Sequence, residues 1–165
     1  MVSASHDFDA PVAALADALR ARGWRLATAE SCTGGMIAAA CTSLAGSSDW
    51  FDRGFVTYSN DAKREMLGVS AALIERHGAV SAEVACAMAQ GALGHSQAML
   101  AVAVTGIAGP GGATPDKPVG TVWLAVAACG AAPRAEMLQL DGDRAAVRAQ
   151  TVRHALARLC EQALA

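Results

Sequence analysis

Two apolar segments joined by a glycine-rich loop constrain the fold of this chain more than any other feature. Residues 100–104 form a continuous apolar run, which is typical of a strand buried on both faces of a sheet. Residues 121–129 form a second buried run, and the loop that begins at Thr105 and leads to it contains too many glycines for a regular helix. Parallel neighbours need a long crossover, usually a helix. We therefore expect part of the sheet to be antiparallel.

Helical and strand patterns alternate along the rest of the sequence. Apolar residues at helical spacing predict a helix over residues 8–22, ended by Gly23. Shorter apolar runs predict strands over residues 24–27 and 54–58, and an alternating pattern predicts an edge strand over residues 134–140. Further helices are predicted to begin near Met36, Ser59, Ser70, Ser81 and Asp143. This order predicts an α/β protein, a three-layer α/β/α sandwich with a mixed, mostly parallel five-stranded sheet.

The length and composition of the chain indicate one domain over residues 1–165, with residues 1–7 as a loose tail. Hydrophobic residues make up 53% and charged residues 17%, which excludes a disordered chain. A net charge of −2 and an aromatic content of 4% give no reason to expect a nucleic-acid partner. The most apolar segment, residues 122–132, is too short to cross a membrane, so no membrane partner is expected.

The cysteines and histidines show no metal-binding pattern. The five cysteines are dispersed without a Cys-x-x-Cys pair, which argues against a zinc site or a disulfide framework and fits a reducing cytoplasm. The four histidines also lack metal-ligand spacing. We therefore expect a cytoplasmic protein without a metal or cofactor. A homo-oligomer is compatible with the sequence, which does not fix the oligomeric state.

The stretch of residues 28–35 places Ser31 where a predicted strand turns into a predicted helix. A hydroxyl there projects at the carboxyl edge of the sheet, where open α/β sheets bind ligands. The first turn of the helix also offers free backbone N–H groups for a phosphate or an oxyanion. Two plainer interpretations stay open. Ser31 or Thr33 could serve only as a helix cap, and Cys32 could be a small core residue rather than a nucleophile.

Five sequence segments occur in an order that resembles a known family. They are residues 28–35, 57–63, 78–81, 103–112 and 117–122. Together they resemble the C-terminal domain of the competence- and damage-inducible CinA family, also known as the nicotinamide-nucleotide amidase or PncC family. Each segment alone is a weak signal, whereas five in register are highly specific. The resemblance covers nearly the whole chain.

The resemblance implies hydrolysis of the carboxamide of nicotinamide mononucleotide, a small pyridine nucleotide, to nicotinate mononucleotide and ammonia. It implies a metal-independent mechanism with Ser31 as nucleophile, assisted by Tyr58 and Lys63. The residues are chemically suited to this reaction. No histidine lies in a motif loop, so Lys63 is the candidate base if burial lowers its pKa. Tyr58 could relay a proton or hold Lys63, and backbone N–H groups near Cys32 could bind the oxyanion.

Further candidate substrate-binding residues lie in the same segments, each with a plainer alternative. Glu30 could orient the turn or a ribose hydroxyl, or could simply pair with a cation. Asn60 could bond the carboxamide, or could only cap a helix. Thr33, Gly34 and Gly35 line the turn, and Thr105 and Gly106 end a buried strand where ligands collect. The last two could instead be needed only for the path of the loop.

Two arginines one helical turn apart are candidates for binding a phosphate. Arg148 is the preferred one, because a guanidinium near a helix start can bind a phosphate with two parallel hydrogen bonds. Arg144 is the rival candidate, and a surface arginine is the plain alternative. For the chain as a whole, the alternative to an amidase is a non-catalytic nucleotide-binding or regulatory domain that uses the same glycine loops.

Overall fold

A five-stranded sheet with the strand order β2-β1-β3-β4-β5 forms the centre of the computed structural model, which describes residues 6–165. The strands are β1 (Leu26–Glu30), β2 (Phe51–Val56), β3 (Leu100–Gly106), β4 (Thr121–Ala128) and β5 (Arg134–Gln139). Strand β1 pairs in parallel with β2 and β3, whereas β3–β4 and β4–β5 are antiparallel. The mixed five-stranded sheet is therefore confirmed. The expectation of a mostly parallel sheet is wrong, because both β3–β4 and β4–β5 are joined by connections without a helix.

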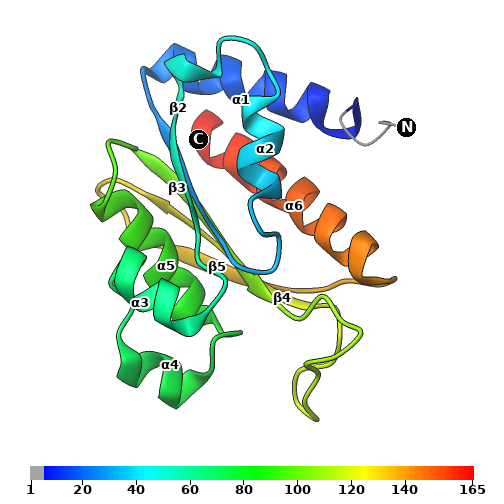
Figure 1. Ribbon diagram of the computed structural model, residues 1–165. Helices are drawn as coiled ribbons and strands as arrows, with labels where there is room; N and C mark the ends of the chain where they lie inside the picture. The colour runs from blue at the N-terminus through cyan, green and yellow to red at the C-terminus, as the bar shows by residue number, and fades with distance from the viewer. Residues whose placement is uncertain (1–5) are drawn as a thin grey trace.

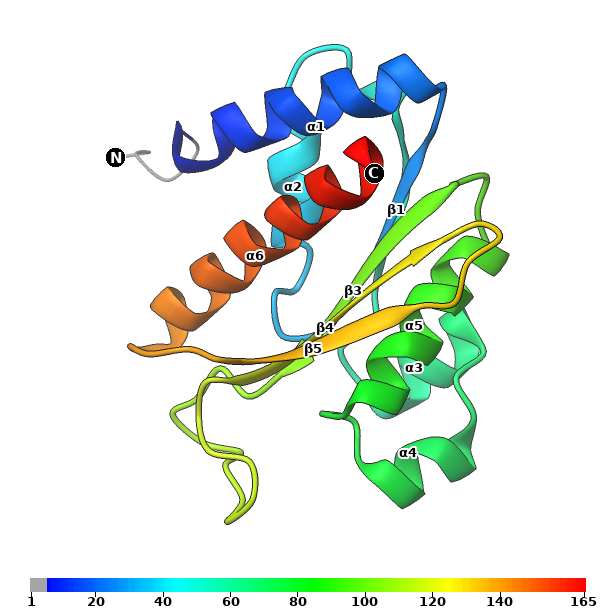
Figure 2. The same ribbon diagram turned by 180° about the vertical axis from the view of Figure 1, so that it is seen from behind.

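Helices cover both faces of the sheet, which confirms the three-layer architecture (Figures 1 and 2). One layer contains α1 (Asp9–Arg22), α2 (Met36–Thr42) and α6 (Arg144–Leu164). The other contains α3 (Asn60–Leu67), α4 (Ala71–His77) and α5 (Ala82–Gly94). Each helix layer encloses its own apolar core against the sheet. Polar side chains that could bind a ligand are therefore expected at the ends of the strands.

The two faces of the sheet differ in side-chain size. Toward α1 and α6, the buried strand residues are mainly leucine and valine: Leu26, Leu100, Val102, Val104, Val122 and Leu124. Toward α5, the buried apolar strand residues are all alanine: Ala27, Ala29, Ala101, Ala103, Ala125 and Ala127. The buried stripe of α5 is also rich in alanine. Small residues on both surfaces let α5 pack closely on the sheet.

Most predicted helix ends are confirmed, because they depend on local capping bonds. Gly23 ends α1 in the left-handed conformation, and the side chains of Ser59, Ser70, Ser81 and Asp143 each accept a backbone N–H bond at the start of α3, α4, α5 and α6. The strand boundaries were less accurate. The edge strand β2 begins at Phe51 rather than at residue 54, because its first residues include the polar pair Asp52 and Arg53.

Strand β1 also differs from its predicted range, residues 24–27, since it runs from Leu26 through Glu30. Its second half contains Thr28 and Glu30, which are polar yet buried. An apolar run therefore could not predict this part of the strand. Of the predicted tail, residues 1–5 lie outside the described residues, and His6 begins a 3-10 helix that continues to Phe8. In the described residues no helix is both long and apolar enough to cross a membrane.

Candidate active site

The candidate site lies where β1 and β3 end side by side. These neighbours are parallel, so Ser31 directly after β1 and Thr105 near the end of β3 come to the same edge of the sheet. The backbone N–H of Ser31 donates to Val104 O at 3.0 Å, which extends the ladder by one residue beyond the strand. Helix α3 leaves the same edge from β2 and carries Lys63 on its buried side.

Lys63 and Ser31 are in direct contact inside the protein. The Lys63 Nζ atom lies 3.1 Å from Ser31 Oγ, and the two residues are only 1% and 8% exposed. Burial lowers the pKa of the Lys63 ammonium, because a charged amine loses its hydration there. No carboxylate in the described chain forms an ion pair with Lys63 that would oppose this effect. The geometry thus favours a neutral amine beside the hydroxyl.

The hydrogen-bond partners of Lys63 match the neutral form. Besides Ser31 Oγ, the Nζ atom lies 3.0 Å from Thr57 O and 3.2 Å from Tyr58 O. A neutral amine has two N–H donors, which suit these two carbonyls, and one lone pair, which can accept the Ser31 O–H. The same atoms can hold an ammonium after proton transfer, since the amine then has three donors for three oxygens. The arrangement can therefore take and return one proton without moving the backbone.

Tyr58 contributes its backbone and its side chain at different places. Its carbonyl oxygen is the acceptor beside Lys63, and it also lies 3.5 Å from Ser31 Oγ. The residue as a whole is 62% exposed, and its hydroxyl accepts a bond from Arg144 at 3.2 Å. The predicted holding of Lys63 is thus a backbone contact, and the hydroxyl makes no hydrogen bond to Ser31 or Lys63 in the described chain.

Glu30 and Thr33 fix the turn that carries Ser31. The Glu30 carboxylate is fully buried and accepts from Thr33 Oγ1 at 2.6 Å, from Ile37 N at 2.8 Å and from Ala38 N at 3.0 Å. These donors lie in the turn and in the first turn of α2, whose free N–H groups favour a negative charge. These bonds fit the first alternative for Glu30, which is to orient the turn. Its carboxylate does not line the cavity next to Ser31.

The turn contains two backbone donors that a ligand could use, although the Cys32 N–H also contacts its own thiol. In the part of the chain that the structure describes, the N–H groups of Cys32 and Thr33 donate to no other residue. Gly34 and Gly35 follow with φ values of +60° and +106°, which L side chains rarely adopt. The neighbouring Cys32 thiol is a poor competitor for Ser31, because burial raises its pKa to about 11. These features can hold an oxyanion next to Ser31 Oγ.

A cavity of about 200 Å³ opens onto these groups. Its lining joins several predicted residues from three separate segments: Ser31, Tyr58, Asn60, Lys63, Thr105 and Gly106. It also includes Ala79, Val80 and Ala108, small apolar residues that carry no chemical signal in the sequence. The hydroxyl of Thr105 already donates its hydrogen bond within the protein, to Ala79 O at 2.9 Å. Gly106 is needed for packing, because a Cβ atom there would meet Val122 and the Thr121 carbonyl.

The two arginines occupy different places. Arg144 lines the cavity, where its guanidinium donates to Gly109 O at 2.9 Å and to the Tyr58 hydroxyl. Arg148 does not line it. Its guanidinium donates to Cys32 O and Thr33 O, at 3.1 Å each, behind the serine turn. The geometry therefore favours Arg144, the rival candidate, as the arginine that a ligand in this cavity could reach.

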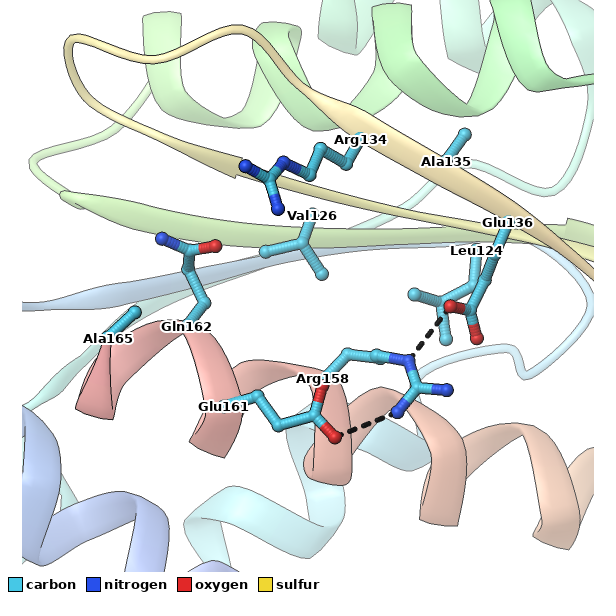
Figure 3. Close-up of a pocket in the computed structure, with 9 residues that line it drawn as sticks. All are labelled: Leu124, Val126, Arg134, Ala135, Glu136, Arg158, Glu161, Gln162 and Ala165. Carbon is cyan, nitrogen blue, oxygen red and sulfur yellow. Dashed lines mark hydrogen bonds and ion pairs between the residues drawn. The ribbon is translucent and has the colours of Figure 1, made fainter.

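A larger cavity, of about 540 Å³, lies elsewhere between α6 and the outer strands (Figure 3). It is lined by Leu124 and Val126 of β4 together with charged residues of β5 and α6. Arg158 is paired there with Glu136 at 2.8 Å and with Glu161 at 2.9 Å. Size alone would favour this cavity, but its lining contains no serine, cysteine or lysine nucleophile. We therefore assign the chemistry to the smaller cavity at Ser31.

The chain is similar to known proteins over nearly its whole length. The family model for the CinA C-terminal domain matches residues 9–163. A relative from Escherichia coli (strain K12), named nicotinamide-nucleotide amidohydrolase PncC, is 51% identical over 147 residues, 89% of either chain. A relative of the same name from Enterobacter agglomerans is 56% identical over 133 residues, 81% of either chain. The crystal structure of competence/damage inducible protein CihA from Agrobacterium tumefaciens superposes with a TM-score of 0.91 at 48% identity, covering 94% of each chain.

Proposed function

This chain belongs to the CinA C-terminal domain family, and we propose that it is an amidohydrolase that converts nicotinamide mononucleotide to nicotinate mononucleotide and ammonia. The family resemblance in the five sequence segments is thereby confirmed. The observation that carries the proposal is the buried contact between Lys63 Nζ and Ser31 Oγ at the end of β1. The names of the two amidohydrolase relatives supply the substrate class.

In the proposed first half-reaction, Ser31 Oγ attacks the carboxamide carbon while Lys63 takes the hydroxyl proton. The free N–H groups of Cys32 and Thr33 would stabilise the oxyanion of the tetrahedral intermediate. When the C–N bond breaks, the Lys63 ammonium returns its proton to the leaving nitrogen, and ammonia departs. A nicotinoyl ester of Ser31 remains.

In the second half-reaction, Lys63 takes a proton from water as the water attacks the ester carbon. The same N–H groups would hold the second oxyanion. Collapse of this intermediate breaks the bond to Ser31 Oγ, which regains its proton from Lys63. The product is the nucleotide carboxylate, and no atom of the protein is consumed.

The ligand contacts follow from the lining of the cavity. Asn60 and Thr105 lie near the serine and would face the pyridine ring and ribose. Arg144 has no carboxylate partner in the described chain, and its guanidinium would exchange the Gly109 carbonyl and the Tyr58 hydroxyl for the phosphate. The described cysteines are free thiols, so we place the reaction in the reducing cytoplasm.

The decisive experiment is ammonia release from nicotinamide mononucleotide by wild type and by Ser31→Ala. We expect the variant to lose about a thousandfold or more in kcat, as for other nucleophile deletions, while it still binds the nucleotide. Ser48→Ala is the matched control, because Ser48 is exposed and distant from the cavity. Turnover within tenfold of wild type would show that Ser31 is not the nucleophile. Nucleotide binding without ammonia release by wild type would support a non-catalytic nucleotide-binding domain instead.

A further inference from the structure

Arg148 connects the last helix to the serine turn in a way that phosphate binding does not explain. It lies in the second turn of α6, is partly buried, and forms no ion pair in the described chain. Its Nε donates to Cys32 O and its NH2 group donates to Thr33 O. The guanidinium thus donates hydrogen bonds to the carbonyls of the two residues that directly follow Ser31.

These contacts fix the direction of the free donors. A peptide group is planar and trans, so its N–H points opposite to its C=O. The carbonyl of Cys32 shares a peptide plane with the N–H of Thr33, and Arg148 holds that carbonyl on the α6 side. The plane before it, which carries the Cys32 N–H, is held by the bond from Gly34 N to Ser31 O at 3.0 Å. Both free N–H groups are therefore turned away from their anchored carbonyls.

We infer that Arg148 is a positioning residue, which orients the Thr33 N–H, and with it the oxyanion site, by anchoring the carbonyls of Cys32 and Thr33. The inference rests on the proposed serine mechanism, and it replaces the phosphate role that the sequence suggested for Arg148.

The shape of the guanidinium explains why an arginine is needed. Its N–H groups form a rigid planar fork that can bond two neighbouring carbonyls at once, whereas lysine has a single ammonium on a flexible stem. Arg148→Lys keeps the charge but cannot hold the carbonyls of Cys32 and Thr33 in the same fixed geometry. Arg153→Lys on the same helix is the matched control, because Arg153 is half exposed and bonds Asp7 far from the serine turn.

The first test compares kcat and KM of Arg148→Lys for nicotinamide mononucleotide and for nicotinamide riboside, which lacks the phosphate. A small misplacement of catalytic groups can cost about a hundredfold, so we expect kcat to fall by about that factor for both compounds. Binding of the mononucleotide, measured by calorimetry on a Ser31→Ala background, should change less than threefold. A loss confined to the phosphorylated compound, or to its binding, would overturn the inference in favour of phosphate binding.

A second readout is independent of the substrate. A fluorophosphonate forms a bond from Ser31 Oγ to phosphorus, fluoride leaves, the hydroxyl proton passes to Lys63, and the phosphoryl oxygen takes the place of the oxyanion. We expect Arg148→Lys to slow this labelling at least tenfold, with Arg153→Lys unchanged. Labelling at the wild-type rate by folded protein would overturn the inference. Wild type that is labelled but releases no ammonia would overturn the proposed function, and the labelling rates would still test Arg148.

Discussion

Lys63 shows how the place of a residue in the fold changes the acidity of its side chain. The residue is in the first turns of α3, where the positive end of the helix and the loss of hydration both disfavour an ammonium. Its backbone acceptors, Thr57 O and Tyr58 O, come from the segment that joins β2 to α3. The sequence offered Lys63 as a base only if burial lowered its pKa, and burial does lower it.

The first residue-scale prediction is that Lys63→Arg abolishes turnover. Arginine keeps the positive charge but cannot lose a proton at accessible pH, so it cannot accept the proton of Ser31. In wild type, kcat/KM should rise as the pH increases through the lowered pKa of Lys63, because only the neutral amine is a base. The measurement is the rate of ammonia release between about pH 6 and about pH 10. Retention of most activity by Lys63→Arg would mean that the residue supplies charge only.

At the scale of elements, α2 is a short helix whose start is built by other segments. Glu30 from β1 bonds its first N–H groups, and Arg148 from α6 bonds the carbonyls of the preceding turn. A seven-residue helix has little stability of its own, so these tertiary contacts decide its position. The turn that carries Ser31 is therefore held between the sheet and α6.

We predict that Glu30→Gln destabilises the protein and slows turnover. The amide would keep one acceptor but would turn a donor toward the N–H groups of Ile37 or Ala38. Loss of a hydrogen bond to a buried charge costs about 2 kcal/mol, or a decrease in Tm of about 4–8 °C for a domain of this size. Thermal melting measures it, with Glu83→Gln at the half-exposed start of α5 as control. An unchanged Tm for Glu30→Gln would contradict the anchoring role of this carboxylate.

The start of α6 carries the predicted phosphate contact. Arg144 bridges the loop after β3 and the Tyr58 hydroxyl, so it can turn to a ligand phosphate without rebuilding the helix. Arg144→Ala should raise KM for nicotinamide mononucleotide by about tenfold or more, equivalent to a charged hydrogen bond of about 1.5–3 kcal/mol. The KM for nicotinamide riboside should change much less. Steady-state kinetics with both compounds decide, and equal effects on both would exclude a phosphate-specific role.

Across the whole molecule, features set by neighbours in sequence were predictable, and those set by distant contacts were not. The serine caps and Gly23 depend on a few adjacent residues, so they could be predicted. The burial of Glu30 could not, because its partners in α2 become neighbours only when the turn folds back. The sequence also could not separate Arg144 from Arg148. They lie one turn apart on α6, and only packing against the serine turn places one in the cavity and the other behind it.

The last prediction concerns the molecule as a whole and its independence of metal ions. In the described residues, no group of three or more histidine, cysteine, aspartate or glutamate side chains is placed to hold a metal ion. The proposed mechanism already assigns a base, Lys63, and oxyanion donors, the N–H groups of Cys32 and Thr33. We therefore expect ammonia release to stay within twofold of its starting value, roughly the error of such assays, after exhaustive treatment with EDTA. The treated enzyme should gain nothing from added Mg²⁺, Mn²⁺ or Zn²⁺. Activity that is lost with the chelator and restored by one of these ions would require a metal-bound nucleophile, and the role of Lys63 would then be to orient Ser31 rather than to deprotonate it.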